Sequence, residues 1–354
     1  MKKIKAGVVG CGGISKNQHI PALMKIDEVE IVAVCDILKE RAEFAREMSG
    51  AKYAFTDYKD LIALSELDMV DICTPNYLHA PVAIEALKSG KHVFCEKPDA
   101  MTVEEVENMK KTSEESGKHL MVMRNHRFRE HSKYAKKYIE DGKCGEIYAG
   151  RCGWIRRRGI PGKGGWFTTK AQSGGGPLID LGVHMIDLTM WLMGNPAPVA
   201  VSGAIYSKFA SAEDISDSEH SAFGDKIKGG TFDVEDLSIG MIRFDNGACL
   251  QIEFSWASNI ECEKGFVELR GSKAGINWED NQLTIYAEEY GSLYDLKPVL
   301  DTRGYAHADN IRHFIDVILY GKKPIFEPIQ GVNMIKILTS LYKSAELGRE
   351  VSLV

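Results

Sequence analysis

Residues 4–15 read IKAGVVGCGGIS, and this stretch decides the fold of the N-terminal part of the chain. An apolar run is followed at once by a turn rich in glycine, and the residues after Ser15 are suited to a helix. Glycines let the chain turn tightly, and the start of a helix offers free N–H groups and a positive dipole to a phosphate. Ser15 takes the place of a third glycine and is small enough for close helix–strand packing. The stretch therefore predicts a strand, a phosphate-binding turn and a helix.

The pattern continues outward from this stretch, because short apolar runs alternate with amphipathic segments over the first 123 residues. Strands are expected at 4–10, 30–36, 52–55, 69–74, 92–95 and 119–123, and helices at 39–48, 79–89 and 102–116. Such alternation gives a doubly wound parallel sheet that binds ligands at the carboxyl ends of its strands. Asp36 ends the second strand, where an acid binds ribose hydroxyls in dinucleotide folds. Residues 1–124 are therefore predicted to form an NAD-binding Rossmann domain.

The pattern changes after Asn125, which predicts a second α/β domain over residues 125–354. Helices are expected at 131–141, 177–193, 308–320 and 331–348, and strands at 146–154, 199–207, 237–244, 248–256 and 266–270. The turn Asp245-Asn246-Gly247 predicts a hairpin. Residues 210–230 are polar and irregular, which indicates a long surface loop or a lid.

Composition narrows the function classes. Hydrophobic residues at 44% and charged residues at 27% are typical of a folded globular protein. The net charge of −6 argues against a nucleic-acid partner. No stretch approaches the roughly 20 apolar residues of a membrane span, and no signal-peptide pattern is seen, so a cytoplasmic location is expected. The eight cysteines contain no Cys-x-x-Cys pair, and no metal site is expected.

Asp36 also predicts the choice of cofactor. A carboxylate there accepts hydrogen bonds from the ribose hydroxyls and repels a 2′-phosphate. Ile37 and Leu38 follow, and Arg41 comes only a helical turn later, so NAD is favoured over NADP. The residues expected to bind the cofactor are Gly10, Gly12, Gly13, Ile14, Asp36, Thr74, Pro75, Asn76, His79, Glu96 and Lys97.

Three residues are candidates for catalysis. Lys97 lies in Glu96-Lys97-Pro98 beyond the fifth strand, where a lysine can polarise a hydroxyl or carbonyl oxygen. Asp180 and His184 are four residues apart on a predicted helix, so they share one face. A carboxylate can orient the imidazole, which suits a general base near neutral pH. The alternatives are a surface lysine, a helix-capping aspartate and a core histidine.

Taken together, these segments resemble the glucose–fructose oxidoreductase / inositol dehydrogenase (Gfo/Idh/MocA) family. The matching segments are 10–15 with 19–21, 34–36, 74–76 with His79, 96–98, 125–128, 174–187 with Trp191, 234–236 and 314–348. The resemblance implies a C-terminal domain with a large, mostly antiparallel open sheet that is often used for subunit contacts. It also implies that Lys97, Asp180 and His184 form the catalytic set, and that a secondary hydroxyl of a sugar, cyclitol or glycoside is oxidised or the matching ketone reduced.

The resemblance further suggests which residues contact the substrate. Trp154, Arg156 and Trp166 fall in the loop region before the triple glycine, although buried core tryptophans and solvated arginines are competing interpretations. The full set expected at the substrate is Lys97, Arg127, Trp154, Arg156, Trp166, Asp180 and His184. A homodimer or homotetramer is expected. Two alternatives are kept open: an NAD-dependent glycosidase or lyase that oxidises only transiently, and a non-enzymatic nucleotide-binding regulator.

Overall fold

The computed structural model describes residues 3–210, 223–280 and 282–354. The chain forms two compact units, Met1–Asn125 with Tyr305–Ile335, and His126–Gly304 with Lys336–Val354. The chain first passes from one unit to the other between residues 125 and 126, next to the predicted domain boundary at 124/125. The assignment of all of 125–354 to the second domain needs correction, because residues 305–335 belong to the first unit.

Helix α9 (Ala306–Tyr320) explains this correction, because it packs on elements that lie early in the sequence. It packs on α1 (Ile20–Met24) and on β5 (His92–Cys95). Phe314 lies against Phe94 with ring centroids 5.3 Å apart. Arg312 forms an ion pair of 2.8 Å with Glu28. These contacts join residues more than 200 positions apart, so local sequence patterns gave no signal for them.

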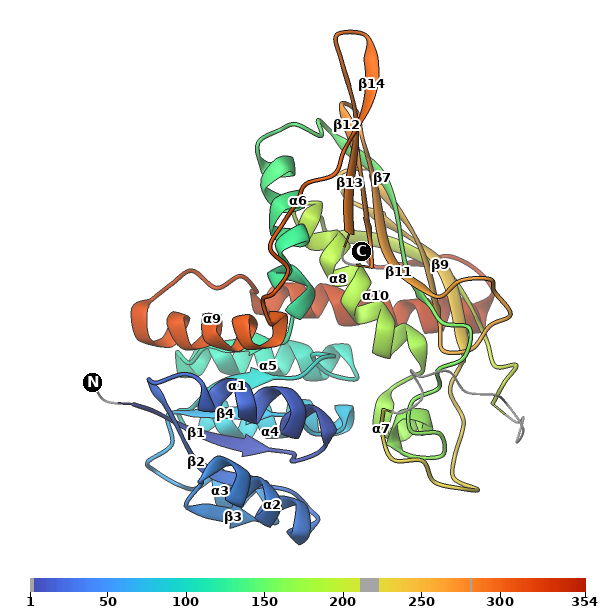
Figure 1. Cartoon of the computed structure of the whole chain (residues 1–354). Helices are drawn as coiled ribbons and strands as arrows, with labels where there is room; N and C mark the ends of the chain where they lie inside the picture. Colours follow the sequence, from blue (N-terminus) through green and yellow to red (C-terminus); the bar gives the residue numbers. More distant parts are fainter. Residues whose placement is uncertain (1–2, 211–222, 281) are drawn as a thin grey trace. The chain divides into compact units, whose positions relative to one another are not determined.

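The first unit is built on a six-stranded parallel sheet in the order β3-β2-β1-β4-β5-β6, as predicted for a doubly wound fold. Its other strands are β1 (Ile4–Val9), β2 (Val29–Cys35), β3 (Tyr53–Phe55), β4 (Met69–Ile72) and β6 (Leu120–Val122). Its other helices are η1 (Ser15–His19), α2 (Lys39–Ser49), α3 (Tyr58–Ile62), η2 (Asn76–Leu78), α4 (His79–Lys88) and α5 (Val103–Ser116), followed by η3 (Asn125–Phe128) where the chain leaves this unit. Helix α1 contacts α2 and α9, while α4 contacts α3 and α5, so the two groups cover opposite faces (Figure 1).

The second unit is built on a nine-stranded sheet in the order β14-β13-β12-β11-β7-β10-β9-β8-β15. Its strands are β7 (Ile147–Ile155), β8 (Pro198–Tyr206), β9 (Leu237–Phe244), β10 (Cys249–Ser255), β11 (Lys264–Gly271), β12 (Ala274–Glu279), β13 (Gln282–Glu289), β14 (Ser292–Leu296) and β15 (Val351–Ser352). Only the neighbours β7 and β10 run parallel; all other neighbours are antiparallel. The large, mostly antiparallel sheet is therefore confirmed, and strands β12 to β15 are additional to those predicted.

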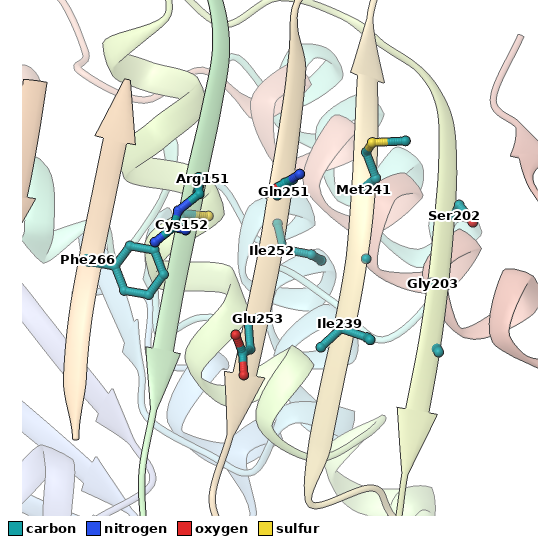
Figure 2. A pocket seen from close by; sticks show the side chains of 12 residues that line it. Arg151, Cys152, Ser202, Gly203, Ile239, Met241, Gln251, Ile252, Glu253 and Phe266 are labelled. Carbon is teal, nitrogen blue, oxygen red and sulfur yellow. The ribbon is translucent and has the colours of Figure 1, made fainter. Parts of the chain in front are cut away.

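Among the described residues, helices cover one face of this sheet and leave the other open. Helix α8 (Val183–Leu192) packs on β7 and β11, and α6 (Glu130–Glu140) packs on α8, β12 and β13. Short helices η4 (Trp166–Thr168), α7 (Lys170–Ser173) and η5 (Leu178–Gly182) precede α8, and α10 (Pro328–Leu347) runs across the division between the units in sequence. Figure 2 shows side chains of β7, β9 and β10 standing on the face away from the helices.

The predicted loop or lid at 210–230 falls partly on residues 211–222, which lie outside the described residues. The part that is described lies against the loop before η4, since the Gly162 N–H donates to the Phe223 carbonyl (2.8 Å) and the Ile227 N–H to that of Lys163 (2.9 Å). Within the part of the chain that the structure describes, no helix combines the length and the apolar character needed to cross a bilayer.

Candidate active site

The glycine turn after β1 has the shape expected of a phosphate-binding loop. Gly10 has a φ of 92°, and a Cβ atom there would lie 2.6 Å from the Cys73 carbonyl, so only glycine fits. A Cβ at Gly12 or Gly13 would meet no described atom within 4 Å. The backbone of these two residues therefore faces open space, as the approach of a pyrophosphate requires.

Asp36 is held at the end of β2 beside this turn. One carboxylate oxygen accepts the N–H of Cys11 (2.9 Å), and the other accepts the N–H of Leu38 (2.9 Å). Ile37 next to it is 78% exposed, which offers apolar surface beside the carboxylate. A fixed carboxylate with an exposed apolar neighbour fits the adenosine end of NAD.

The loops after β4 and β5 are tied together at the same edge of the sheet. The ring nitrogens of buried His79 lie 2.7 Å from the Pro98 carbonyl and 2.9 Å from the Thr74 carbonyl. The Lys97 N–H donates to its neighbour Glu96 (3.0 Å). His79, predicted to bind the cofactor, thus joins the two loops that carry the predicted binding residues Thr74, Pro75, Asn76, Glu96 and Lys97.

A buried ion network lies beneath these loops, and sequence reasoning did not find it. His19 at the end of η1 is fully buried; its Nδ1 lies 3.0 Å from both carboxylate oxygens of Asp71, and its Nε2 lies 2.8 Å from Glu96. Burial opposes protonation of His19, but the negative charge of Asp71 raises its pKa well above 6.5. Burial likewise opposes ionisation of Glu96, but the hydrogen bond and charge of His19 lower its pKa to about 2. The network therefore holds a histidinium between two carboxylates.

His19, Asp71 and Cys73 bring ligand atoms within 4.8 Å of one another, a grouping that could hold a metal ion. Both nitrogens of His19 already face carboxylates. We therefore interpret the cluster as an ion network and assign it no metal.

In the second unit, the predicted helix at 177–193 is formed by the π-helix η5 and by α8, which follows it directly. The carboxylate of buried Glu235 accepts the N–H of Gly176 (3.0 Å) and that of Leu178 (3.1 Å). The hydroxyl of Tyr342 donates to the same carboxylate (2.8 Å). A π-helical segment is often found at functional sites, and here it carries Asp180.

The surroundings of Asp180 and His184 differ in part from those expected. Asp180 accepts a hydrogen bond of 3.0 Å from the indole Nε1 of Trp256, a residue that the sequence did not single out. The His184 ring centroid lies 5.1 Å from that of His126 and 6.0 Å from that of Trp154. His126 belongs to the segment 125–128 that resembles the family, but it was not predicted as a site residue. Two histidines and an aromatic face thus meet on the helix side of the sheet.

The remaining predicted substrate residues lie in three different places. The Arg156 guanidinium lies 5.2 Å from the ring centre of Trp154, so these two join the His184 cluster. The Trp166 ring stacks on Phe167 at 3.8 Å. The side chain of Arg127 is 1% exposed and pairs with Asp187 through two hydrogen bonds of 2.7 and 2.8 Å. This buried pair joins η3 to α8. In the second unit, Arg127 therefore has a structural role in holding these two elements together.

Lys97 lies in the first unit, whereas Asp180 and His184 lie in the second. The catalytic set expected from the sequence thus draws on both units.

Comparison with known proteins agrees with these features. Residues 4–124 match the model of the oxidoreductase family with an NAD-binding Rossmann fold, and residues 132–277 match the GFO/IDH/MocA C-terminal domain. The D-glucoside 3-dehydrogenase of Escherichia coli is 32% identical over 99% of this chain and 97% of that protein. The myo-inositol 2-dehydrogenase of Thermotoga maritima is 26% identical over 99% of this chain and 98% of its own length.

Solved structures share the whole fold. A levoglucosan dehydrogenase in complex with NADH has a TM-score of 0.86 at 23% identity and covers all of both chains. The two family models together span most of the sequence, and the chain therefore belongs to the GFO/IDH/MocA family of oxidoreductases.

Proposed function

We propose that the protein is an NAD-dependent dehydrogenase that oxidises a secondary hydroxyl of a glycoside, with carbon 3 of a glucoside as the reacting centre. The observation that carries this proposal is the pair Asp180 and His184 on one helix, beside the ring of Trp154 and the guanidinium of Arg156. An aromatic face and a guanidinium suit the C–H and hydroxyl groups of a sugar. Two relatives are named for oxidation at position 3 of a glucose unit: the D-glucoside 3-dehydrogenase above and a glucose-6-phosphate 3-dehydrogenase of Bacillus subtilis, 34% identical over 54% of the chain.

Each residue has a distinct role in this proposal. His184 accepts the proton of the substrate hydroxyl, because a neutral imidazole is a base near neutral pH. Lys97 stabilises the negative charge that develops on the oxygen. Asp180 stabilises the protonated imidazole. When bound, NAD supplies the acceptor for the hydride.

The residues of the first unit that would hold NAD are the glycine turn and Asp36. The open space at Gly12 and Gly13 fits the pyrophosphate, and the fixed carboxylate fits the ribose hydroxyls. We infer a preference for NAD over NADP from the same carboxylate, since a 2′-phosphate would be placed against its charge.

Replacing Asp36 with serine should weaken NAD binding by about 10- to 100-fold and reduce the preference for NAD over NADP, because a hydrogen bond from the ribose to a charged group is worth about 1.5–3 kcal/mol. Titration of both cofactors by fluorescence quenching measures the effect. Asp57→Ser is a matched control, because Asp57 caps α3 by accepting the Lys59 N–H and should leave both affinities unchanged. Equal or tighter binding of NADP by the unmutated protein would contradict the assignment.

The activity is tested by screening methyl glucosides, disaccharides, free sugars and inositols for NADH formation. We expect net NADH formation with a glucoside and a keto product whose carbonyl lies at carbon 3 by NMR. A glycosidase that oxidises only transiently would instead cleave the glycoside without accumulating NADH. A nucleotide-binding regulator would give neither product.

We also infer that the protein is a homodimer or homotetramer in which the open face of the nine-stranded sheet is covered by a second copy. This face carries a hollow of about 510 Å³ lined by residues of β7, β8, β9, β10 and β11, among them Arg151, Ile239 and Glu253 (Figure 2). Ile239 is 40% exposed on it. An apolar side chain between charged groups of both signs suits a self-complementary contact.

Multi-angle light scattering should give two or four times the chain mass of 39.3 kDa at micromolar concentration. Ile239→Asp should shift the mass toward that of one chain, because it would bury a charge in the contact. Phe44→Asp alters an exposed apolar residue of α2 and should leave the mass unchanged. A mass near 39.3 kDa for the unmutated protein would contradict the inference.

A further inference from the structure

Trp256 is a buried tryptophan whose polar atom points at a candidate catalytic residue. It follows β10 directly and is fully buried. Its indole Nε1 donates to one carboxylate oxygen of Asp180 at 3.0 Å. A buried indole N–H needs an acceptor, and a carboxylate is a stronger acceptor than a backbone carbonyl. The pairing therefore fixes the carboxylate of Asp180 as well as satisfying the indole.

Both partners of this hydrogen bond are anchored to one short segment, Val234-Glu235-Asp236. The carboxylate of Glu235 accepts the N–H groups of Gly176 and Leu178 and so holds the start of the helix that carries Asp180. The carbonyl of Asp236 accepts the backbone N–H of Trp256 (2.9 Å). A Cβ at Gly176 would overlap the carbonyl oxygen of Glu235, so the approach of the two chains depends on glycine. The segment thus sets the positions of donor and acceptor together.

Asp180 is partly exposed, so its carboxylate is not enclosed by the core. Arg156, from the loop after β7, is close enough for its positive charge to act on Asp180. His184 follows one turn later on α8. Within the second unit, Trp256 supplies a neutral, buried donor to this carboxylate, whereas Arg156 supplies a positive charge from a guanidinium that packs on Trp154.

We propose that Trp256 is a positioning residue for catalysis, which holds one oxygen of Asp180 so that the other oxygen is presented to the imidazole and the substrate. This inference rests on the proposed function, because it takes Asp180 as part of the catalytic set. Trp256 itself touches neither substrate nor cofactor in this assignment.

Trp256→Phe removes the donor and keeps an aromatic ring in the core. We expect kcat to fall by about 10- to 100-fold, the size that loss of one hydrogen bond to a charged group gives, while KM changes little. The pH profile of kcat/KM should also change, because the carboxylate that orients the base is no longer held, whereas a purely structural change would leave the profile in place. Trp191→Phe is the matched control: Trp191 lies on α8 itself and packs against Arg127 and Lys136.

Asp180→Asn separates this inference from the proposed function. If Asp180→Asn keeps full activity, the catalytic assignment of Asp180 fails, and the role of Trp256 fails with it. If Asp180→Asn is inactive but Trp256→Phe behaves like Trp191→Phe in rate and pH profile, only the inference about Trp256 is overturned. The double variant should be no slower than Asp180→Asn alone, because the two residues act through one hydrogen bond.

A second measurement does not depend on the stability of the Trp256→Phe variant. The chain has five tryptophans, so ¹⁵N-indole labelling gives five N–H signals, and four Trp→Phe variants assign the fifth by elimination. Asp180→Asn should shift the signal of Trp256 more than the other four. An unshifted Trp256 signal would contradict the hydrogen bond and the inference built on it.

Discussion

Replacing His184 with alanine should lower turnover by about 100- to 10,000-fold, the usual cost of losing a general base. Lys97→Ala should have an effect of similar size, because it removes the charge that stabilises the developing alkoxide. NAD affinity should stay nearly unchanged in His184→Ala, because His184 is not among the residues expected to bind the cofactor. Residues that act as a unit are strongly non-additive, so the double variant should be little slower than either single one.

Steady-state kinetics on the best glycoside, with NAD binding measured separately, tests this expectation. His131→Ala and Lys88→Ala are matched controls: His131 is a buried histidine of α6 in the second unit, and Lys88 is an exposed lysine at the end of α4 in the first. Turnover within a few-fold of the parent in either His184→Ala or Lys97→Ala would make that residue structural.

Replacing His19 with leucine should destabilise the first unit by about 3–5 kcal/mol, because it leaves two buried carboxylates without their shared partner. His119→Leu, at an exposed histidine that stacks on His92, should cost far less. Urea denaturation followed by far-UV circular dichroism measures both. An effect of His19→Leu no larger than that of His119→Leu would show that the network does not stabilise the fold.

The stability lost in His19→Leu should also depend on pH. The direction of this dependence follows from the pKa shifts of His19 and Glu96. The raised pKa of His19 gives stability that is fully present below its unfolded value, about 6.5, and is lost as the pH rises through the folded value. The lowered pKa of Glu96 gives stability that is present above its unfolded value, about 4.5, and is lost as the pH falls toward about 2. The difference between parent and His19→Leu should therefore be largest between about pH 4.5 and 6.5. A difference that is constant from pH 4 to 9 would contradict a charged network.

The sequence was most informative where local chemistry dictates structure. The glycine turn, the position of Asp36 and the strand–helix alternation all follow from short-range rules, and the structure has each of them in place. The spacing of Asp180 and His184 likewise placed both on one continuous helical segment.

Features that depend on distant residues could not be predicted from one sequence. The partner of His19 lies 52 residues away at Asp71, and that of Asp180 lies 76 residues away at Trp256. His126 lies against His184 because the fold packs η3 against α8. The buried ion pair of Arg127 with Asp187 joins the same two elements. Strands β12 to β14 were not predicted, although the buried Leu283 and Ile285 alternate with less buried positions in β13.

Deuterium transfer tests the central proposal most directly. Methyl glucosides that carry deuterium at carbon 2, 3 or 4 are each oxidised with NAD, and the nicotinamide product is analysed by mass spectrometry. We predict that the glucoside labelled at carbon 3 gives deuterated NADH with a slowed rate, and that the other two give unlabelled NADH. Deuterium arriving from carbon 2 or 4 would contradict the assigned reacting centre, and no NADH from any glycoside, sugar or cyclitol would contradict the dehydrogenase itself.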